Sequence, residues 1–118
     1  MVGRKLVAIE SPYAGNIYIN VAYARLAMLD SIRRGEAPFA SHVLYTQILD
    51  DKIPEDRALG IEMGMAWTNT ASLIAFYTDL GFSPGMTDCL TKIKSHLIRI
   101  PYEIRKLRAD VFDTFRQI

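Results

Sequence analysis

Polar and aromatic residues gather in one short stretch near the start of the chain, Ser-Pro-Tyr-Ala-Gly-Asn at positions 11–16. An apolar run ends just before it, and a helical pattern begins just after it, where Gly15 precedes Asn16. Backbone N–H groups at a helix start are unpaired and lie at the positive end of the helix dipole, so they can bind a phosphate or a hydroxyl-rich group. Ser11 and Asn16 can add hydrogen bonds, and Tyr13 offers a flat face to a base or sugar. Plain helix capping and turn formation explain the same residues without a ligand.

A second stretch, Ser-Pro-Gly-Met at positions 83–86, repeats this arrangement before a later helical pattern. Ser83 is a candidate N-cap, and Gly85 and Met86 begin the helix beside it. Ordinary capping explains this loop alone as well. Two such loops facing one crevice would suit a ligand with two polar ends, as a nucleotide has.

His42 and Tyr45 share a third polar segment and are further candidates for ligand contact. A lone histidine in a loop is also a common hydrogen-bonding residue, and the sequence does not pair it with a Ser or Cys nucleophile. The four acidic residues between positions 50 and 56 have a spacing that matches no calcium loop, so they are interpreted as a solvated helix start. No metal ion and no cofactor are therefore predicted.

Strand-like and helical patterns alternate along the chain, and the polar segments described above lie between them. Strands are expected at 6–9, 37–45, 72–77 and, more weakly, 100–104, and helices at 16–34, 50–67, 86–97 and 109–118. This alternation predicts an α/β protein with a three-layer flavodoxin-like (Rossmann-like) fold, a parallel sheet of four to five strands and helices on both faces. In such sheets ligands bind beyond the carboxyl ends of the strands, which is where the segments 11–16, 41–51 and 78–85 would lie.

Composition sets further bounds. The 118 residues suit a single domain spanning 1–118, and half of them are hydrophobic. A formal net charge of +1 gives no electrostatic case for nucleic acid or a membrane surface as partner. The single cysteine, Cys89, excludes an internal disulfide, and no apolar run is long enough to span a membrane, so a cytoplasmic location is expected.

The motifs taken together resemble the nucleoside 2-deoxyribosyltransferase-like superfamily, and most closely a compact group of it found in bacteriophage and prophage genomes. The resemblance covers Leu6 to about Ile104 and rests on the ordered segments IESPYAGN, GEAPFASHVLYTQILDD, PEDRALGIEMGMAW and SPGM. It implies a flavodoxin-like sheet, cleavage or transfer of the bond between a sugar and a base, a nucleoside or nucleotide as ligand, and a homodimer or larger homo-oligomer.

The resemblance also implies roles for residues. Ser11, Tyr13, Gly15 and Asn16 would line the sugar or phosphate site, and Ser83, Gly85 and Met86 would form the opposite wall. His42 and Tyr45 would approach the base. Such enzymes use a carboxylate to offset oxocarbenium-like charge while a proton donor assists the leaving group.

Two positions depart from the pattern that the resemblance implies. Cys89 stands where the helix glutamate is expected, and Ser72 where an aspartate begins the third strand. Asp88, one residue before Cys89, is the first candidate for the catalytic carboxylate, and Asp79 and Glu62 are the alternatives. The sequence thus leaves two functions open, namely a nucleoside deoxyribosyltransferase or nucleotide N-glycoside hydrolase using Asp88, and a catalytically lapsed protein that senses or sequesters a nucleotide. A structural partner in an assembly is a third possibility.

Overall fold

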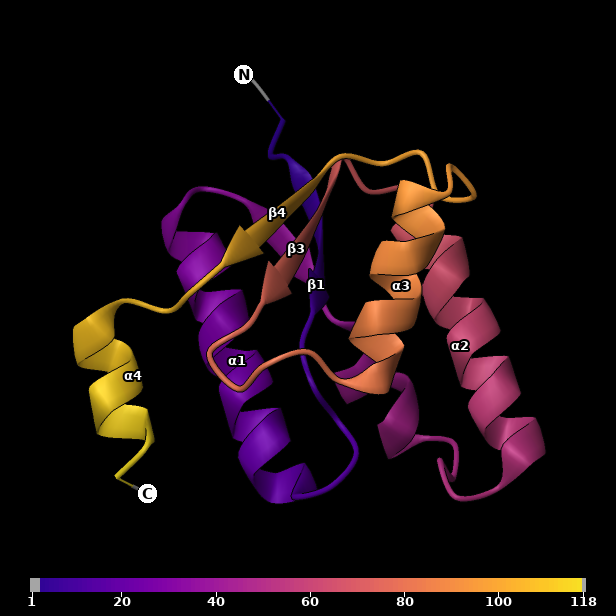
Figure 1. Cartoon of the computed structure of the whole chain (residues 1–118), viewed down its shortest axis with the longest axis horizontal. Coiled ribbons are helices and arrows are strands. Elements are labelled where there is room, and N and C mark those ends of the chain that lie inside the picture. Colours follow the sequence, from indigo (N-terminus) through magenta and orange to yellow (C-terminus); the bar gives the residue numbers. More distant parts are fainter. Residues whose placement is uncertain (1–2, 118) are drawn as a thin grey trace.

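The computed structural model describes residues 3–117 and shows an α/β protein with one parallel sheet (Figure 1). Its strands are β1 (Leu6–Glu10), β2 (Ala37–Phe39), β3 (Leu73–Tyr77) and β4 (Tyr102–Arg105), in the order β2-β1-β3-β4. Its helices are α1 (Ile17–Arg33), α2 (Pro54–Thr68), α3 (Pro84–Lys94) and α4 (Ala109–Phe115), with short 3-10 helices η1 (Ser41–Val43) and η2 (Tyr45–Gln47). The predicted three-layer, flavodoxin-like class is confirmed. No helix within residues 3–117 is both long and apolar enough to cross a membrane.

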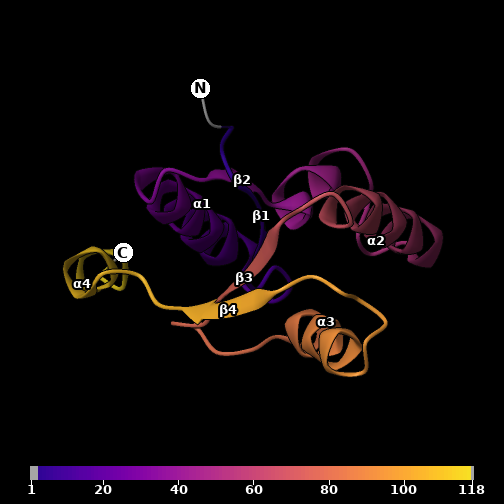
Figure 2. The ribbon, with the colours of Figure 1, turned by 90° about the horizontal axis from the view of Figure 1, so that it is seen from above.

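The helices cover both faces of the sheet in pairs, α1 with α4 and α2 with α3 (Figure 2). Side chains alternate between the faces along each strand. Val7 and Ile9 of β1 therefore pack with Tyr23 of α1 and Phe115 of α4, while Ala8 packs on the opposite side, where α2 and α3 lie. β3 is buried along its whole length, and its sequence is a continuous apolar run. Such a run is typical of a central strand in a parallel sheet.

The second strand is shorter than the sequence predicts. It ends at Phe39, and the chain then leaves the sheet as the turns η1 and η2 instead of continuing as a strand to residue 45. Space for these turns comes from a glycine on α2, since a Cβ added at Gly64 would lie 2.7 Å from Ser41 Oγ. The predicted positions of the other strands hold to within one or two residues.

The third helix begins at Pro84, where the missing N–H of proline is harmless, and Ser83 caps it by accepting a hydrogen bond from the Met86 N–H at 3.2 Å. It stops before the predicted residue 97 because His96 adopts a left-handed conformation with φ 65°. The Leu97 N–H then bonds the Lys92 carbonyl at 2.9 Å, which closes the last turn.

A polar cluster joins α1, the start of β2 and β4 on the face away from α2 and α3. Arg105 donates to both carboxylate oxygens of Glu36 at 2.8 Å, and its side chain is only 3% exposed. Ser31 donates to the same Glu36 at 2.8 Å, and Tyr77 Oη donates to Asp30 at 2.6 Å. This cluster links the two outer parts of the sheet through side chains.

Candidate functional site

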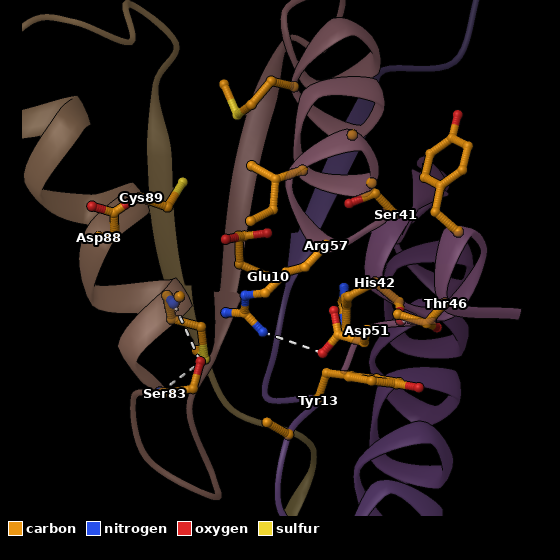
Figure 3. Close-up of a pocket in the computed structure, with 18 of the residues that line it drawn as sticks. Glu10, Tyr13, Ser41, His42, Thr46, Asp51, Arg57, Ser83, Asp88 and Cys89 are labelled. Carbon is orange, nitrogen blue, oxygen red and sulfur yellow. Dashed lines mark hydrogen bonds and ion pairs between the residues drawn. The ribbon is translucent and has the colours of Figure 1, made fainter. Parts of the chain in front are cut away.

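A pocket of about 280 Å³ opens at the carboxyl edge of the sheet, between α2 and α3 (Figure 3). The loop after β1, the turns η1 and η2, and the first turns of α3 all contribute to its lining. This is the crevice in which open parallel sheets bind their ligands. The volume is close to the lower end of the range typical of small-molecule sites, which is roughly 300–1,000 Å³.

Glu10, the last residue of β1, lines this pocket at the level of the sheet. Because side chains alternate, Glu10 points to the same side as Ala8, toward α2 and α3. Its backbone is held in the sheet by pairing with Phe76 of β3. Burial raises the pKa of the Glu10 carboxyl to about 7, and the neighbouring Cys89 thiol offsets part of that effect as a hydrogen-bonding partner. The pocket therefore contains a carboxyl group that is poised to exchange a proton near neutral pH.

Glu10 is not among the residues that the sequence singles out. One signal does exist, since a charged residue directly follows the apolar run Leu-Val-Ala-Ile and precedes the Ser-Pro turn. A charge at the carboxyl end of an otherwise buried parallel strand lies at the ligand-binding edge of the sheet. Along the sequence alone, the same charge is simply an interruption of an apolar segment.

Cys89 lies on α3 and faces Glu10 across the pocket (Figure 3). Burial, together with the nearby Glu10 carboxylate, raises the pKa of the Cys89 thiol to about 12. The thiol is therefore protonated at neutral pH and is a poor nucleophile. Cys89 therefore contributes a small, neutral hydrogen-bonding group to the pocket.

His42 and Ser11 form a hydrogen-bonded pair that the sequence did not predict. Ser11 Oγ lies 2.7 Å from His42 Nε2, although the two residues are 31 positions apart. Burial lowers the pKa of His42 to about 4, so the imidazole is neutral at neutral pH. The parallel pairing of β1 with β2 brings the residues that follow each strand to the same edge of the sheet. A neutral imidazole beside a hydroxyl can orient a ligand hydroxyl by hydrogen bonding.

Two ion pairs lie on opposite walls of the pocket. On the α2 side, Arg57 Nη1 lies 3.2 Å from Asp51 Oδ2, and on α3, Lys92 Nζ lies 2.9 Å from Asp88 Oδ2. The Asp88 side chain is 64% exposed, which places this carboxylate in a wetter environment than Glu10. Each wall thus carries a cation that is paired with a carboxylate of the same wall, and the α2 side carries Asp56 in addition.

Most of the predicted site residues meet in this pocket. Its lining includes Ser11, Tyr13, His42, Tyr45, Ser83, Gly85, Met86 and Asp88. The described lining does not include Gly15 or Asn16. Asn16 instead caps α1 by accepting a hydrogen bond from the Ile19 N–H at 3.2 Å, and Gly15 has the positive φ of 99° that the turn requires.

Ser72, which stands where the resemblance implies an aspartate, and Asp79, an alternative carboxylate, both have structural partners away from the pocket. The backbone N–H of Ser72 bonds the Leu6 carbonyl at 2.8 Å at the start of β3, which is the opposite end of the strand from the pocket. Asp79 accepts hydrogen bonds from Tyr23 Oη at 2.6 Å and from the Leu107 N–H at 2.9 Å. Neither residue is part of the described lining.

The acidic side chains of the pocket are spread over different walls. Among residues 3–117, no three His, Cys, Asp or Glu side chains gather closely enough to hold a metal ion. The side chains that line the pocket supply carboxyl groups, a neutral imidazole, hydroxyl groups, a thiol and two cations.

The fold and this pocket define a flavodoxin-like α/β domain with a small-molecule crevice at the carboxyl edge of its sheet. The chain belongs to a family described as "Domain of unknown function (DUF7768)", whose family model matches residues 5–103. The matched residues include β1, β2, β3 and the first two residues of β4. They also include every residue that lines the pocket. No curated protein matches the chain.

Proposed function

We propose that this protein cleaves or transfers the N-glycosidic bond of a nucleoside or nucleotide, with Glu10 as the proton donor to the departing base. The observation that carries the proposal is the Glu10 carboxyl at the carboxyl edge of the sheet, with its pKa raised to about 7 by burial. The resemblance of the sequence to the nucleoside 2-deoxyribosyltransferase-like superfamily supports the choice of reaction.

Two carboxyl groups in different environments can divide the work of such a reaction. A buried carboxyl with a raised pKa stays protonated long enough to act as an acid, whereas a solvated one stays ionised and stabilises positive charge. Glu10 has the first environment, and the exposed, Lys92-paired Asp88 has the second. Asp88 is thus the carboxylate that would face the oxocarbenium-like sugar carbon.

The steps of hydrolysis balance with these two residues. The bond between the anomeric carbon and the base nitrogen breaks, its electron pair leaves with the base, and the Glu10 proton is transferred to the base. A water molecule adds to the anomeric carbon and its proton restores Glu10. In the transfer reaction a second base takes the place of water. In this proposal His42, neutral and bonded to Ser11, would orient a hydroxyl of the sugar.

The test is release of free base, measured by chromatography, from a panel of ribo- and deoxyribonucleosides and their monophosphates. Glu10→Gln should slow release by about a hundredfold or more, the usual contribution of a general acid. Activity of the wild-type protein should fall as pH rises above about 7, because Glu10 then loses its proton. Glu62→Gln changes an exposed glutamate of α2 that is absent from the described lining, and it serves as the matched control.

A second substrate separates the two carboxyl roles. The base of 7-methylguanosine already carries a positive charge and needs no proton to leave. Glu10→Gln should therefore cleave it at nearly the wild-type rate, while Asp88→Asn should be slow on both kinds of substrate. Absence of base release from every substrate, or equal rates for wild type and Glu10→Gln on unmodified nucleosides, would refute the proposal.

One observation favours a second candidate, a protein that binds a nucleotide without turning it over. The position on α3 for which the resemblance implies a glutamate holds Cys89, whose thiol is neutral at neutral pH because burial raises its pKa. In this case nucleotides would raise the melting temperature without releasing base. A ligand at 100 times its Kd stabilises a protein by about 2.7 kcal/mol, which a thermal-shift measurement detects readily.

A further inference from the structure

We propose that Arg57 is the docking point for a phosphate monoester group of the ligand, and that Asp51 occupies this point in the ligand-free protein. The identity of the remainder of the ligand as a nucleoside rests on the proposed function. The anion site itself is inferred from the arrangement of charged side chains in the pocket. Arg57 is not among the site residues that the sequence predicts.

Arg57 projects from the first turns of α2 into the pocket, where its guanidinium meets Asp51 (Figure 3). The pair makes one contact, Nη1 to Oδ2 at 3.2 Å, and the Arg57 side chain remains 51% exposed. A guanidinium has five N–H donors in a planar fork that matches phosphate geometry. A phosphate can thus make two parallel hydrogen bonds where Asp51 makes a single long one.

Asp51 can leave Arg57 without unfolding the turn that carries it. The turn before α2 is fastened by neighbouring groups: Asp56 accepts from the Asp50 N–H at 2.9 Å, and Asp50 accepts from the Lys52 N–H at 3.0 Å. The Ile53 N–H also bonds the Asp50 carbonyl at 3.0 Å. None of these bonds involves the Asp51 side chain. An exposed ion pair of this kind contributes little to stability, so a ligand displaces it at small cost.

The other acidic side chains that face the pocket either have a bonding partner or are partly protonated. Asp56 is bound to the Asp50 N–H, Asp88 is paired with Lys92, and Glu10 is partly protonated at neutral pH. Once Asp51 turns to solvent, the Arg57 guanidinium loses its ion-pair partner and its N–H donors are free to bind a ligand. A phosphate oxygen can take the place of the Asp51 carboxylate on Arg57, and Lys92 on the opposite wall adds a second positive charge to the pocket.

The experiment compares affinities by titration calorimetry for a nucleoside, its 5′-monophosphate and inorganic phosphate, with four proteins. Wild type should bind the monophosphate more tightly than the nucleoside. Arg57→Gln should weaken monophosphate binding by about ten- to a hundredfold, the usual loss for a charge-assisted hydrogen bond, and leave nucleoside binding unchanged. Asp51→Asn should tighten monophosphate binding several-fold because the internal competitor is gone. Arg99→Gln removes an exposed arginine absent from the described lining and should behave as wild type.

The outcomes separate this inference from the proposed function. If Arg57→Gln and Asp51→Asn leave the affinity ratio of monophosphate to nucleoside unchanged, the anion site is refuted, even where Glu10-dependent base release is seen. If binding depends on Arg57 but no base is released, the anion site stands and the proposed reaction falls. If inorganic phosphate binds as tightly as the monophosphate, or if no phosphate compound binds, the assignment to a nucleotide is overturned.

Discussion

Glu10 and Asp88 show how the same functional group acquires different properties within one pocket. Glu10 ends a buried strand, and its carboxyl is desolvated, whereas Asp88 sits on the exposed side of α3 beside Lys92. Desolvation disfavours the charged form of a carboxyl, so the folded protein binds the Glu10 proton more tightly than the unfolded chain does. Burial of the Glu10 carboxyl therefore lowers the stability of the folded protein at pH values where the group is charged.

The cost at Glu10 can be measured. Its pKa is about 7 in the folded protein against an ordinary value of 4.5, so stability decreases as pH rises from about 4.5 to 7. Glu10→Gln removes the buried charge and should raise the free energy of unfolding by about 1–3 kcal/mol at pH 8 but hardly at pH 4. Urea denaturation followed by fluorescence of Trp67, the single tryptophan, reports the change. The same effect at both pH values would contradict a desolvated carboxyl, and Glu62→Gln again provides the control.

At the scale of elements, α2 is shaped by two glycines that face the turns lining the pocket. A Cβ added at Gly64 would approach Ser41 Oγ at 2.7 Å and Ser41 Cβ at 2.9 Å, too close to be relieved by rotating one hydroxyl. A Cβ added at Gly60 would meet Leu49 Cδ1 at 3.5 Å, which is ordinary contact. The two positions are about one helical turn apart, yet only Gly60 has room for a side chain.

This difference predicts opposite effects of the same substitution. Gly60→Ala should stabilise the protein by about 0.5–1 kcal/mol, because alanine favours the helix and finds space. Gly64→Ala should destabilise it by about 1–3 kcal/mol, because η1 must move and the gain in helix propensity does not offset the overpacking. Thermal or urea unfolding of the two variants side by side tests the close approach of α2 and η1. Equal effects of both substitutions would show that the approach is looser than described.

At the scale of the whole molecule, the Arg105 cluster joins parts of the chain that no single element connects. Glu36 precedes the edge strand β2, and Arg105 ends the opposite edge strand β4, yet their side chains form two hydrogen bonds at 2.8 Å. The hydrogen bonds from Arg105 to Glu36 are the main cause of a lowered pKa of that carboxyl. The carboxylate form therefore stabilises the fold above its ordinary pKa, and this stability is lost as pH falls through the lowered value.

Removing one partner of this cluster should be costly. Arg105→Ala leaves Glu36, whose side chain is 12% exposed, without its cation and should lower the free energy of unfolding by about 3–5 kcal/mol. Arg108→Ala breaks an exposed pair with Asp110, whose side chains are 68% and 65% exposed, and should cost about 1 kcal/mol or less. Urea unfolding midpoints distinguish these values. A loss for Arg105→Ala no larger than for Arg108→Ala would show that the cluster does not hold the sheet edges together.

Much of this architecture could be predicted from the sequence, because local patterns decide it. The apolar run of β3, the helical spacing after Asn16 and the Ser-Pro start of α3 each follow from rules that act over a few residues. The Ser11–His42 pair could not be found in this way, because it depends on β1 lying beside β2. Glu10 was missed for a different reason: its importance comes from burial, which a one-residue charge at the end of an apolar run does not reveal.

The position of the two ion pairs in the pocket has a mechanical consequence. Asp51 binds Arg57 on the α2 side, and Asp88 binds Lys92 within α3, so each pair is internal to one wall. Among residues 3–117 no salt bridge connects one wall to the other. Both walls pack on the same sheet, which holds Glu10. The width of the pocket can adjust by small tilts of α2 or α3 without breaking an ionic contact, while the Glu10 backbone keeps its place in the sheet. For the proposed function, a pocket whose width adjusts in this way would accept both the single ring of a pyrimidine and the double ring of a purine.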